Sequence, residues 1–462
     1  MDIASLSFPG APCVKVPPPG PASRALLERQ AERESNARTY PRGFPLAVAR
    51  ARGATIEDVD GNVFIDGWAG AGTLCVGHNH PDVVAAATEQ MGKAIHTLDL
   101  PSPTKDKFTT TILSLLPKNL QGKMKIHFAA PTGADATEAA IKLVKTATGR
   151  RSILSFQGGY HGMTHGALAV TGSTEPKEAI ANLMPDVHFM PYGFCYRCAL
   201  GLKPETCDLA CAKFTESVLS DPSSGVTKPA GIILEAVQGE GGSVPAPVSF
   251  LQRIAAIAKA HGVPLIVDEV QAGMGRTGKW FAFEHAGIEP DVITMSKAIG
   301  GGGFPMAVVL YKKELDVWKP GAHVGTFRGF LPAMAAGIAA IEFMRSHDIV
   351  GHVAEVGARL KAGLTAVAAK RSFLGECRGL GFMLGVEVLK GDGTKAPSYE
   401  NAKRVRAECL RRGLIVELAG RHDGVVRFIP PLVFTADHAD AAIRIFDEAT
   451  AAVEPTAKVK AA

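Results

Sequence analysis

One lysine stands where an apolar strand is expected to end. The segment DVITMS leads directly into Lys297, and four glycines follow at Gly300 to Gly303. Burial lowers the pKa of an ammonium group and exposes a nucleophilic amine, which is what bond formation with a carbonyl compound requires. The glycines would let the backbone approach whatever the amine holds. Taken singly, the feature is more simply explained by a strand-end lysine that reaches solvent.

Two carboxylates stand at the end of another apolar strand. Asp268 and Glu269 interrupt the otherwise apolar run from Leu265 to Val270. Burying them is costly unless a cation meets at least one of them. In an open parallel sheet the carboxyl ends of the strands face the ligand crevice, so a cationic ligand is one solution. The other is a carboxylate that caps the next loop or pairs with Arg276.

A turn of small residues connects a third strand to a helix. In PTGADATEAAIKLVK, Thr132, Gly133 and Ala134 follow the strand, and a helix with an apolar stripe begins there. The first N–H groups of a helix lack partners within it, and the positive end of its dipole attracts anions by about 0.3–2 kcal/mol. The turn could therefore hold a phosphate, or it could be a plain connection with a polar cap.

The three features share one ligand. A lysine for an aldehyde, an acid for a ring nitrogen and a helix terminus for a phosphate are the protein contacts expected of pyridoxal 5′-phosphate. Their joint occurrence by chance is far less common than that of each part. The residues therefore predict a pyridoxal-phosphate enzyme.

The elements that must position these residues alternate along the chain. From Lys125 onward, short apolar runs are separated by helical stretches, which predicts a mostly parallel sheet covered on both faces. Before it, a helical stretch at about 22–34 leads to an alternating pattern around Asp60-Gly61, typical of a β-hairpin. We predict an N-terminal arm and part of a small domain over residues 1–65, a large cofactor domain over 66–331 and a small α/β domain over 332–462.

Composition excludes several classes of protein. The 462 residues carry 50 Lys and Arg against 45 Asp and Glu, a net charge of +5 with no basic block, which argues against nucleic-acid binding. No apolar run approaches the roughly 18 residues of a membrane span, and the start has no secretory pattern. We expect a cytoplasmic protein with no membrane partner. Eight cysteines in so long a chain do not indicate a disulfide scaffold.

Several longer motifs resemble class III pyridoxal-phosphate aminotransferases of fold type I, the group of ornithine, GABA and diaminobutyrate aminotransferases. They are GHNHP, FQGGYHG, EAVQGEGG, VDEVQAGMGRTGKW, MSKAIGGG, GTFRG and VVRFIPPL, and the similarity runs from about residue 52 to residue 431. The resemblance implies a large domain with a seven-stranded, mostly parallel sheet and a smaller α/β domain. It also implies ping-pong transfer of an amino group from a small-molecule donor to a 2-oxo acid.

The resemblance also implies how the cofactor ring is held. Lys297 would bind the aldehyde and then carry the proton between substrate and cofactor, and Asp268 would keep the ring nitrogen protonated. Val270 and Tyr160 would lie against opposite faces of the ring. Gln271 would reach the 3′-oxygen.

For the phosphate, the resemblance implies backbone N–H groups of Gly133 and Ala134. Thr326 would reach the phosphate of the neighbouring subunit's cofactor, so a homodimer with active sites at the subunit interface is part of the prediction. His161 adjoins the ring in the motif, where a packing role and a chemical role are equally expected.

For the substrate, Arg427 matches the arginine that binds the substrate carboxylate, and Glu240 matches the glutamate that pairs with this arginine until 2-oxoglutarate arrives. Motifs such as AGAGTL, YHGMTHGALAVTG and PGAHVGTFRG are similar to those of diaminobutyrate aminotransferases. The implied reaction moves a terminal amino group from 2,4-diaminobutyrate to 2-oxoglutarate. Phe330 stands where relatives usually carry Asn, and could change the shape of the substrate entrance.

Three alternatives stay open. An amino-acid racemase or epimerase would use the same lysine and aspartate on the same fold. Another ω-aminotransferase would take ornithine, GABA, a β-amino acid or an amine, with pyruvate as a second acceptor. The spacing of Cys195, Cys198, Cys207 and Cys211 would suit a zinc site, but packed thiols are the favoured interpretation and no metal is predicted.

Overall fold

The computed structural model describes residues 2–454 and divides into two compact units. The first contains the chain up to His80 and from Gly351 onward, and the second runs from Pro81 to Val350. The domain limits expected from the sequence, after residues 65 and 331, remain a prediction.

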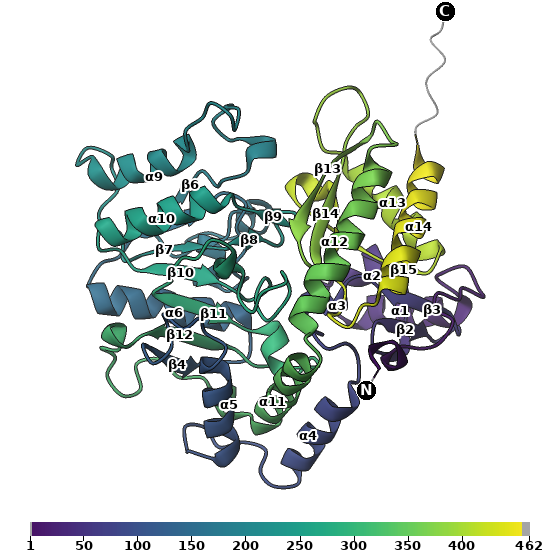
Figure 1. Cartoon of the computed structure of the whole chain (residues 1–462), viewed down its shortest axis with the longest axis horizontal. Coiled ribbons are helices and arrows are strands. Elements are labelled where there is room, and N and C mark those ends of the chain that lie inside the picture. The colour runs from purple at the N-terminus through teal and green to yellow at the C-terminus, as the bar shows by residue number, and fades with distance from the viewer. Residues whose placement is uncertain (1, 455–462) are drawn as a thin grey trace, which may run out of the picture. The chain divides into compact units, whose positions relative to one another are not determined.

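A seven-stranded sheet forms the centre of the second unit (Figure 1). Its strands pair in the order β4, β12, β11, β10, β7, β5 and β6, and β12 is antiparallel to both of its neighbours while the other pairs are parallel. Their bounds are β4 (Met124–Phe128), β5 (Ile153–Phe156), β6 (Val187–Met190), β7 (Gly231–Leu234), β10 (Leu265–Asp268), β11 (Val292–Met295) and β12 (Val308–Lys312). The predicted mostly parallel sheet is confirmed.

Helices cover this sheet, and the best example of their packing is α6 (Gly133–Thr148). Its alanines, leucine and valine recur every three or four residues, which places them on one face. That face is buried against Ile153, Ile233 and Ile266 of the sheet. The other helices of the unit are α4 (Pro81–Met91), α5 (Pro103–Leu113), α7 (His165–Val170), α8 (Glu175–Glu178), α9 (Ala210–Ser220), α10 (Val248–Ala260) and α11 (Leu331–Ser346).

Several short elements lie between the longer strands and helices of the second unit. A hairpin joins β8 (Val237–Gln238) to β9 (Val244–Pro245). Single 3₁₀ turns lie at η2 (Cys195–Arg197), η3 (Ala282–His285), η4 (Lys297–Gly300), η5 (Lys313–Leu315) and η6 (Thr326–Gly329).

The first unit is built around two four-stranded sheets. One pairs β1 (Val48–Arg52), β2 (Thr55–Asp58), β3 (Val63–Asp66) and β15 (Leu414–Ile415); the other pairs β13 (Leu374–Leu380), β14 (Met383–Val388), β17 (Val425–Phe428) and β16 (Glu417–Ala419). The predicted hairpin is the antiparallel pair of β2 and β3, and Gly61 in its turn has a φ of +80°. Because β15 pairs with β3, the sheet joins segments from both halves of the chain.

The remaining elements of this unit are helical. They are η1 (Ile3–Leu6), α1 (Pro21–Arg33), α2 (Tyr40–Gly43), α3 (Ala69–Gly72), α12 (Ile349–Ala368), which begins two residues before the unit boundary, α13 (Tyr399–Arg411), η7 (Arg421–Asp423) and α14 (Ala436–Val453). Across residues 2–454, no helix is long and apolar enough to cross a membrane.

Candidate active site

The predicted cofactor residues meet at the carboxyl edge of the large sheet. There the loops that follow β5, β7, β10 and β11 and the start of α6 enclose a cavity of about 270 Å³. Its lining consists of Thr132, Gly133, Ala134, Tyr160, His161, Gly162, Met163, Glu235, Glu240, Asp268, Val270, Gln271 and Lys297. Segments up to 165 residues apart in sequence are brought together because parallel strands all end at one edge.

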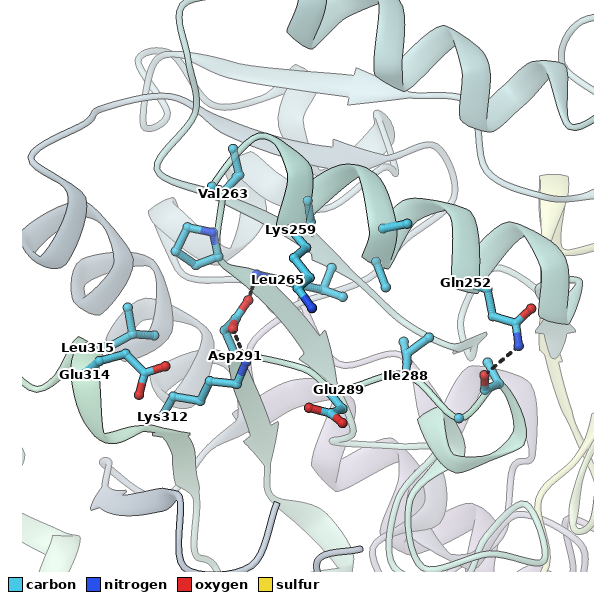
Figure 2. A pocket seen from close by; sticks show the side chains of 17 residues that line it. Gln252, Lys259, Val263, Leu265, Ile288, Glu289, Asp291, Lys312, Glu314 and Leu315 are labelled. Carbon is cyan, nitrogen blue, oxygen red and sulfur yellow. Dashed lines mark hydrogen bonds and ion pairs between the residues drawn. The ribbon is translucent and has the colours of Figure 1, made fainter. Parts of the chain in front are cut away.

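A larger cavity, of about 570 Å³, lies at the opposite edge of the same sheet (Figure 2). Two of its charged groups are paired with each other: Lys312 Nζ donates to Asp291 Oδ1 at 2.6 Å, and the Leu265 N–H donates to Asp291 Oδ2 at 2.8 Å. None of the predicted cofactor or substrate residues lines it. The larger volume is therefore not a guide to the active site. The smaller cavity is the candidate, because the predicted cofactor residues line it.

Lys297 reaches the smaller cavity from an unusual backbone conformation. It is the first residue of η4, two residues past the end of β11, and its φ is +48°. A lysine pays a steric penalty in this left-handed region, so the surrounding fold must enforce it. The conformation turns the chain sharply at the sheet edge and leaves the lysine in the lining of the cavity.

Asp268 is held in the cavity by two contacts. Its side chain is 4% exposed, Oδ1 accepts the Val270 N–H at 3.0 Å, and Oδ2 lies 2.7 Å from His161 Nδ1. Each carboxylate oxygen can accept a further hydrogen bond, so a ring nitrogen could still be held. His161, whose role was left open above, contacts this carboxylate directly.

Glu269 has a different structural role from Asp268. Its carboxylate accepts the N–H groups of Ala282 at 2.8 Å and Phe283 at 2.9 Å, the start of η3. Burial raises the pKa of Glu269 to about 8, and the two backbone hydrogen bonds oppose that rise. The capping alternative for a strand-end carboxylate is thus realised by Glu269, while Asp268 alone lines the cavity.

The start of α6 is shaped for close approach. Thr132 caps the helix by accepting the Asp135 N–H, which leaves the N–H groups of Gly133 and Ala134 for a ligand. A β-carbon added to Gly133 would lie 2.8 Å from a methyl carbon of Val270. Only glycine fits between the helix and the strand-end valine.

The remaining side chains of the cavity form linked pairs. Gln271 Nε2 donates to Glu240 Oε1 at 3.2 Å, and the Tyr160 N–H donates to Glu235 Oε1 at 2.8 Å. Burial raises the pKa of the Tyr160 phenol, so it stays neutral. Glu235 was missed by sequence reasoning, although its position directly after an apolar strand is the same signal that singled out Asp268.

Two predicted residues lie elsewhere among those described. Thr326 opens η6 in the second unit and does not line the cavity. Arg427 belongs to β17 of the first unit, where it is 1% exposed and pairs in register with Glu417 of β16. The predicted roles of these and the other site residues remain proposals.

The four closely spaced cysteines do share one small cavity. Pro191 to Cys195 and the segment from Cys198 to Cys211 contribute its lining, and burial raises the pKa of the Cys211 thiol. Within residues 2–454, however, no group of three or more His, Cys, Asp or Glu side chains is arranged to hold a metal ion.

Comparison with known proteins places the chain in a family. The model of the class-III aminotransferases matches residues 37–450. Diaminobutyrate–2-oxoglutarate aminotransferase from Rhizobium meliloti is 49% identical over 418 residues, with 88% of each chain covered. The Haemophilus influenzae protein of the same name is 46% identical, with 88% of this chain and 91% of the relative covered.

Solved structures agree. An amine transaminase from an uncultivated Pseudomonas species, in its pyridoxal-phosphate-bound form, has a TM-score of 0.82 at 26% identity and covers 91% of this chain and 98% of its own. An (S)-enantioselective ω-transaminase from Thermomicrobium roseum has a TM-score of 0.82 at 28% identity, covering 93% and 98%.

The cavity fits the cofactor that this family uses. It offers one amine, one buried anionic partner held in place by two hydrogen bonds, and a helix start that a single β-carbon would obstruct. With these groups and a family match over some nine-tenths of its length, the chain belongs to the class-III aminotransferases and is a pyridoxal-phosphate-dependent transaminase.

Proposed function

We propose that this transaminase moves the terminal amino group of 2,4-diaminobutyrate to 2-oxoglutarate. The single observation that carries the proposal is the similarity, at 46–49% identity over 88% of the chain, to two proteins named for that reaction.

When bound, pyridoxal phosphate supplies an electron sink for the carbanion that forms at the substrate carbon. In our proposal Lys297 would hold the aldehyde of the cofactor, and its Nζ would carry the proton that moves during the reaction. Asp268 holds the ring nitrogen protonated. Val270 and Tyr160 confine the ring between them, and Gln271 donates to the ring oxygen.

Gly133 and Ala134 would hold the phosphate through their backbone N–H groups. Arg427 would bind a substrate carboxylate, with Glu240 as its counter-ion when the bound molecule lacks a second carboxylate. The hydrogen bond from Gln271 to Glu240 supports this scheme, because it ties the glutamate to a cofactor-contacting residue. Buried guanidinium groups require such a counter-ion.

The donor is tested by a panel of diaminobutyrate, ornithine, lysine, GABA, β-alanine and taurine against 2-oxoglutarate and pyruvate. We expect kcat/KM for diaminobutyrate with 2-oxoglutarate to exceed that of every other pair by at least tenfold, a difference of about 1.4 kcal/mol in transition-state binding. A higher kcat/KM for another donor would contradict the assignment of diaminobutyrate and identify that donor as the preferred substrate. Racemisation of the donor without a 2-oxo acid would point instead to the racemase alternative.

We also propose that the enzyme is a homodimer to which Thr326 contributes across the interface. Apolar side chains at Ile95, Leu98, Leu100, Val324 and Phe327 are 46–69% exposed. They lie on two segments joined by hydrogen bonds from the Leu331 N–H to the Ile95 carbonyl and from the Thr97 N–H to the Gly329 carbonyl. Apolar surface gathered in this way supports a protein interface.

The dimer proposal predicts the mass of the protein in solution. Sedimentation at micromolar concentration should give about twice 48.5 kDa. Phe327→Glu should shift the protein toward the monomer and lower its activity, because a charge would be buried in the contact. A control substitution, Val48→Glu, changes a side chain that is 58% exposed in the first unit and should leave the mass unchanged. A monomeric unchanged protein would refute the proposal.

A further inference from the structure

Glu235 is a buried carboxylate to which the proposed reaction gives no role. It directly follows β7, and its side chain lines the same cavity as Asp268. Leu234 of β7 and Val267 of β10 are register partners, and Glu235 and Asp268 each come one residue after that pair. Two acidic residues therefore stand side by side at the edge where the cofactor ring is expected.

The hydrogen bonds of Glu235 connect two loops of the site. Oε1 accepts the Tyr160 N–H at 2.8 Å, and Oε2 accepts the Gly239 N–H at 2.8 Å. The first loop carries the tyrosine expected on the ring face, and the second carries Glu240. Two backbone donors also favour the ionised form of the carboxyl group, since they stabilise negative charge.

His161 stands between this carboxylate and Asp268. Its Nδ1 contacts Asp268, while its Nε2 is buried with no hydrogen-bond partner among the described residues. A β-carbon added to Gly159 would lie 3.1 Å from that Nε2 and 3.8 Å from Glu235 Oε1, so the glycine keeps the space beside both groups open. His161 thus has one carboxylate hydrogen-bonded on one side and a second carboxylate close to the other.

The groups that surround Glu235 set the pKa of its carboxyl group. Burial raises the pKa of Glu235 to about 7, with the charge of Asp268 raising it further and His161 and the two backbone donors lowering it. Two phenols lie near it: Tyr160, and Tyr192, whose hydroxyl donates to the Glu235 carbonyl. Glu240 and Lys297 complete the charged lining of the cavity.

We propose that Glu235 is a positioning residue that adds a second negative charge beside the Asp268–His161 pair, and so extends upward the pH range over which the cofactor ring nitrogen stays protonated. A ring nitrogen loses its proton as pH rises, and an additional buried anion close by opposes that loss. The proposal rests on the role proposed for Asp268.

The test compares the titration of the ring nitrogen in five proteins reconstituted with ¹⁵N-labelled pyridoxal phosphate. We expect the ring nitrogen to lose its proton at least about one pH unit lower in Glu235→Gln than in the unchanged protein. Glu235→Asp keeps the charge and should stay within about half that shift. Glu269→Gln is the matched control, since that carboxylate is similarly buried and also accepts two backbone N–H groups but does not line the cavity, and it should shift the titration less than half as much as Glu235→Gln.

A second measurement does not depend on the cofactor. In the cofactor-free protein, the ¹⁵N chemical shifts of the His161 imidazole should differ between Glu235→Gln and the unchanged protein, because a neighbouring anion is gone. Equal ring titration in Glu235→Gln and the unchanged protein would overturn the proposal, even with weaker cofactor binding. Asp268→Asn distinguishes a failure of the Glu235 proposal from a failure of the role proposed for Asp268. If Asp268→Asn also leaves the ring titration unchanged, the role proposed for Asp268 is wrong.

Discussion

Replacing Lys297 by alanine is expected to lower turnover by more than about a thousandfold and to remove the absorbance of the covalently bound cofactor. Two functions are lost together, the amine that bonds to the aldehyde and the group that moves the proton. The cofactor itself should still bind through the remaining contacts. The measurement is steady-state transamination together with a visible spectrum of the reconstituted variant.

Lys259→Ala is the control for this experiment. Lys259 lines the larger cavity at the opposite sheet edge (Figure 2), so its loss should change kcat/KM by less than about twofold. A small amine added to Lys297→Ala should restore part of the activity by replacing the missing base. Turnover in Lys297→Ala comparable to that of the control would show that the site has been assigned to the wrong lysine.

Replacing Asp268 by asparagine is expected to lower kcat/KM by at least a hundredfold. The change preserves the shape of the side chain but removes its charge, so the ring nitrogen loses the anion that keeps it protonated. Removing one preorganised electrostatic group from an active site commonly costs about 10²–10³ in rate. The contact with His161 changes as well: because the side-chain oxygen must still accept the Val270 N–H, the amide nitrogen would face Nδ1 and donate to it, which requires the other ring tautomer.

The experiment measures both kinetics and the dissociation constant of the cofactor. Glu269→Gln, the neighbouring carboxylate outside the cavity, provides the comparison, and its kinetics should stay within about threefold of the unchanged protein. If Asp268→Asn also stayed within that margin, the buried pair with His161 would be structural. If Asp268→Asn bound the cofactor more weakly but kept a normal kcat, Asp268 would serve only to hold the cofactor.

Much of the fold was predictable because the apolar patterns in the sequence match the faces that are buried in the structure. The strand and helix alternation after Lys125 predicted the parallel sheet, since strands buried on both faces must be apolar throughout. The alternation around Asp60-Gly61 predicted the hairpin of β2 and β3 for the same kind of reason. The antiparallel direction of β12 was not predictable, because its sequence, VVLYK, suits a buried strand of either direction.

The sequence also singled out most of the residues that line the site. Lys297 and Asp268 stood out because a charged residue that ends an apolar strand needs a reason, and Gly133 and Ala134 because a helix start beside a strand end can hold an anion. Glu235 carried the same signal and was passed over. Its partners, the Tyr160 and Gly239 N–H groups, come from loops whose conformation no local pattern specifies.

What the sequence determined by itself was the chemistry available: which groups can form a bond to an aldehyde, hold a ring nitrogen or bind a phosphate, and on which strands they sit. Residue type and periodicity carry that information locally. Only the tertiary structure decided that Asp268 lines the cavity while Glu269 caps η3, that His161 contacts Asp268, and that the larger cavity lies at the wrong edge. Those outcomes depend on contacts between segments far apart in the chain, and they follow from strand order and register.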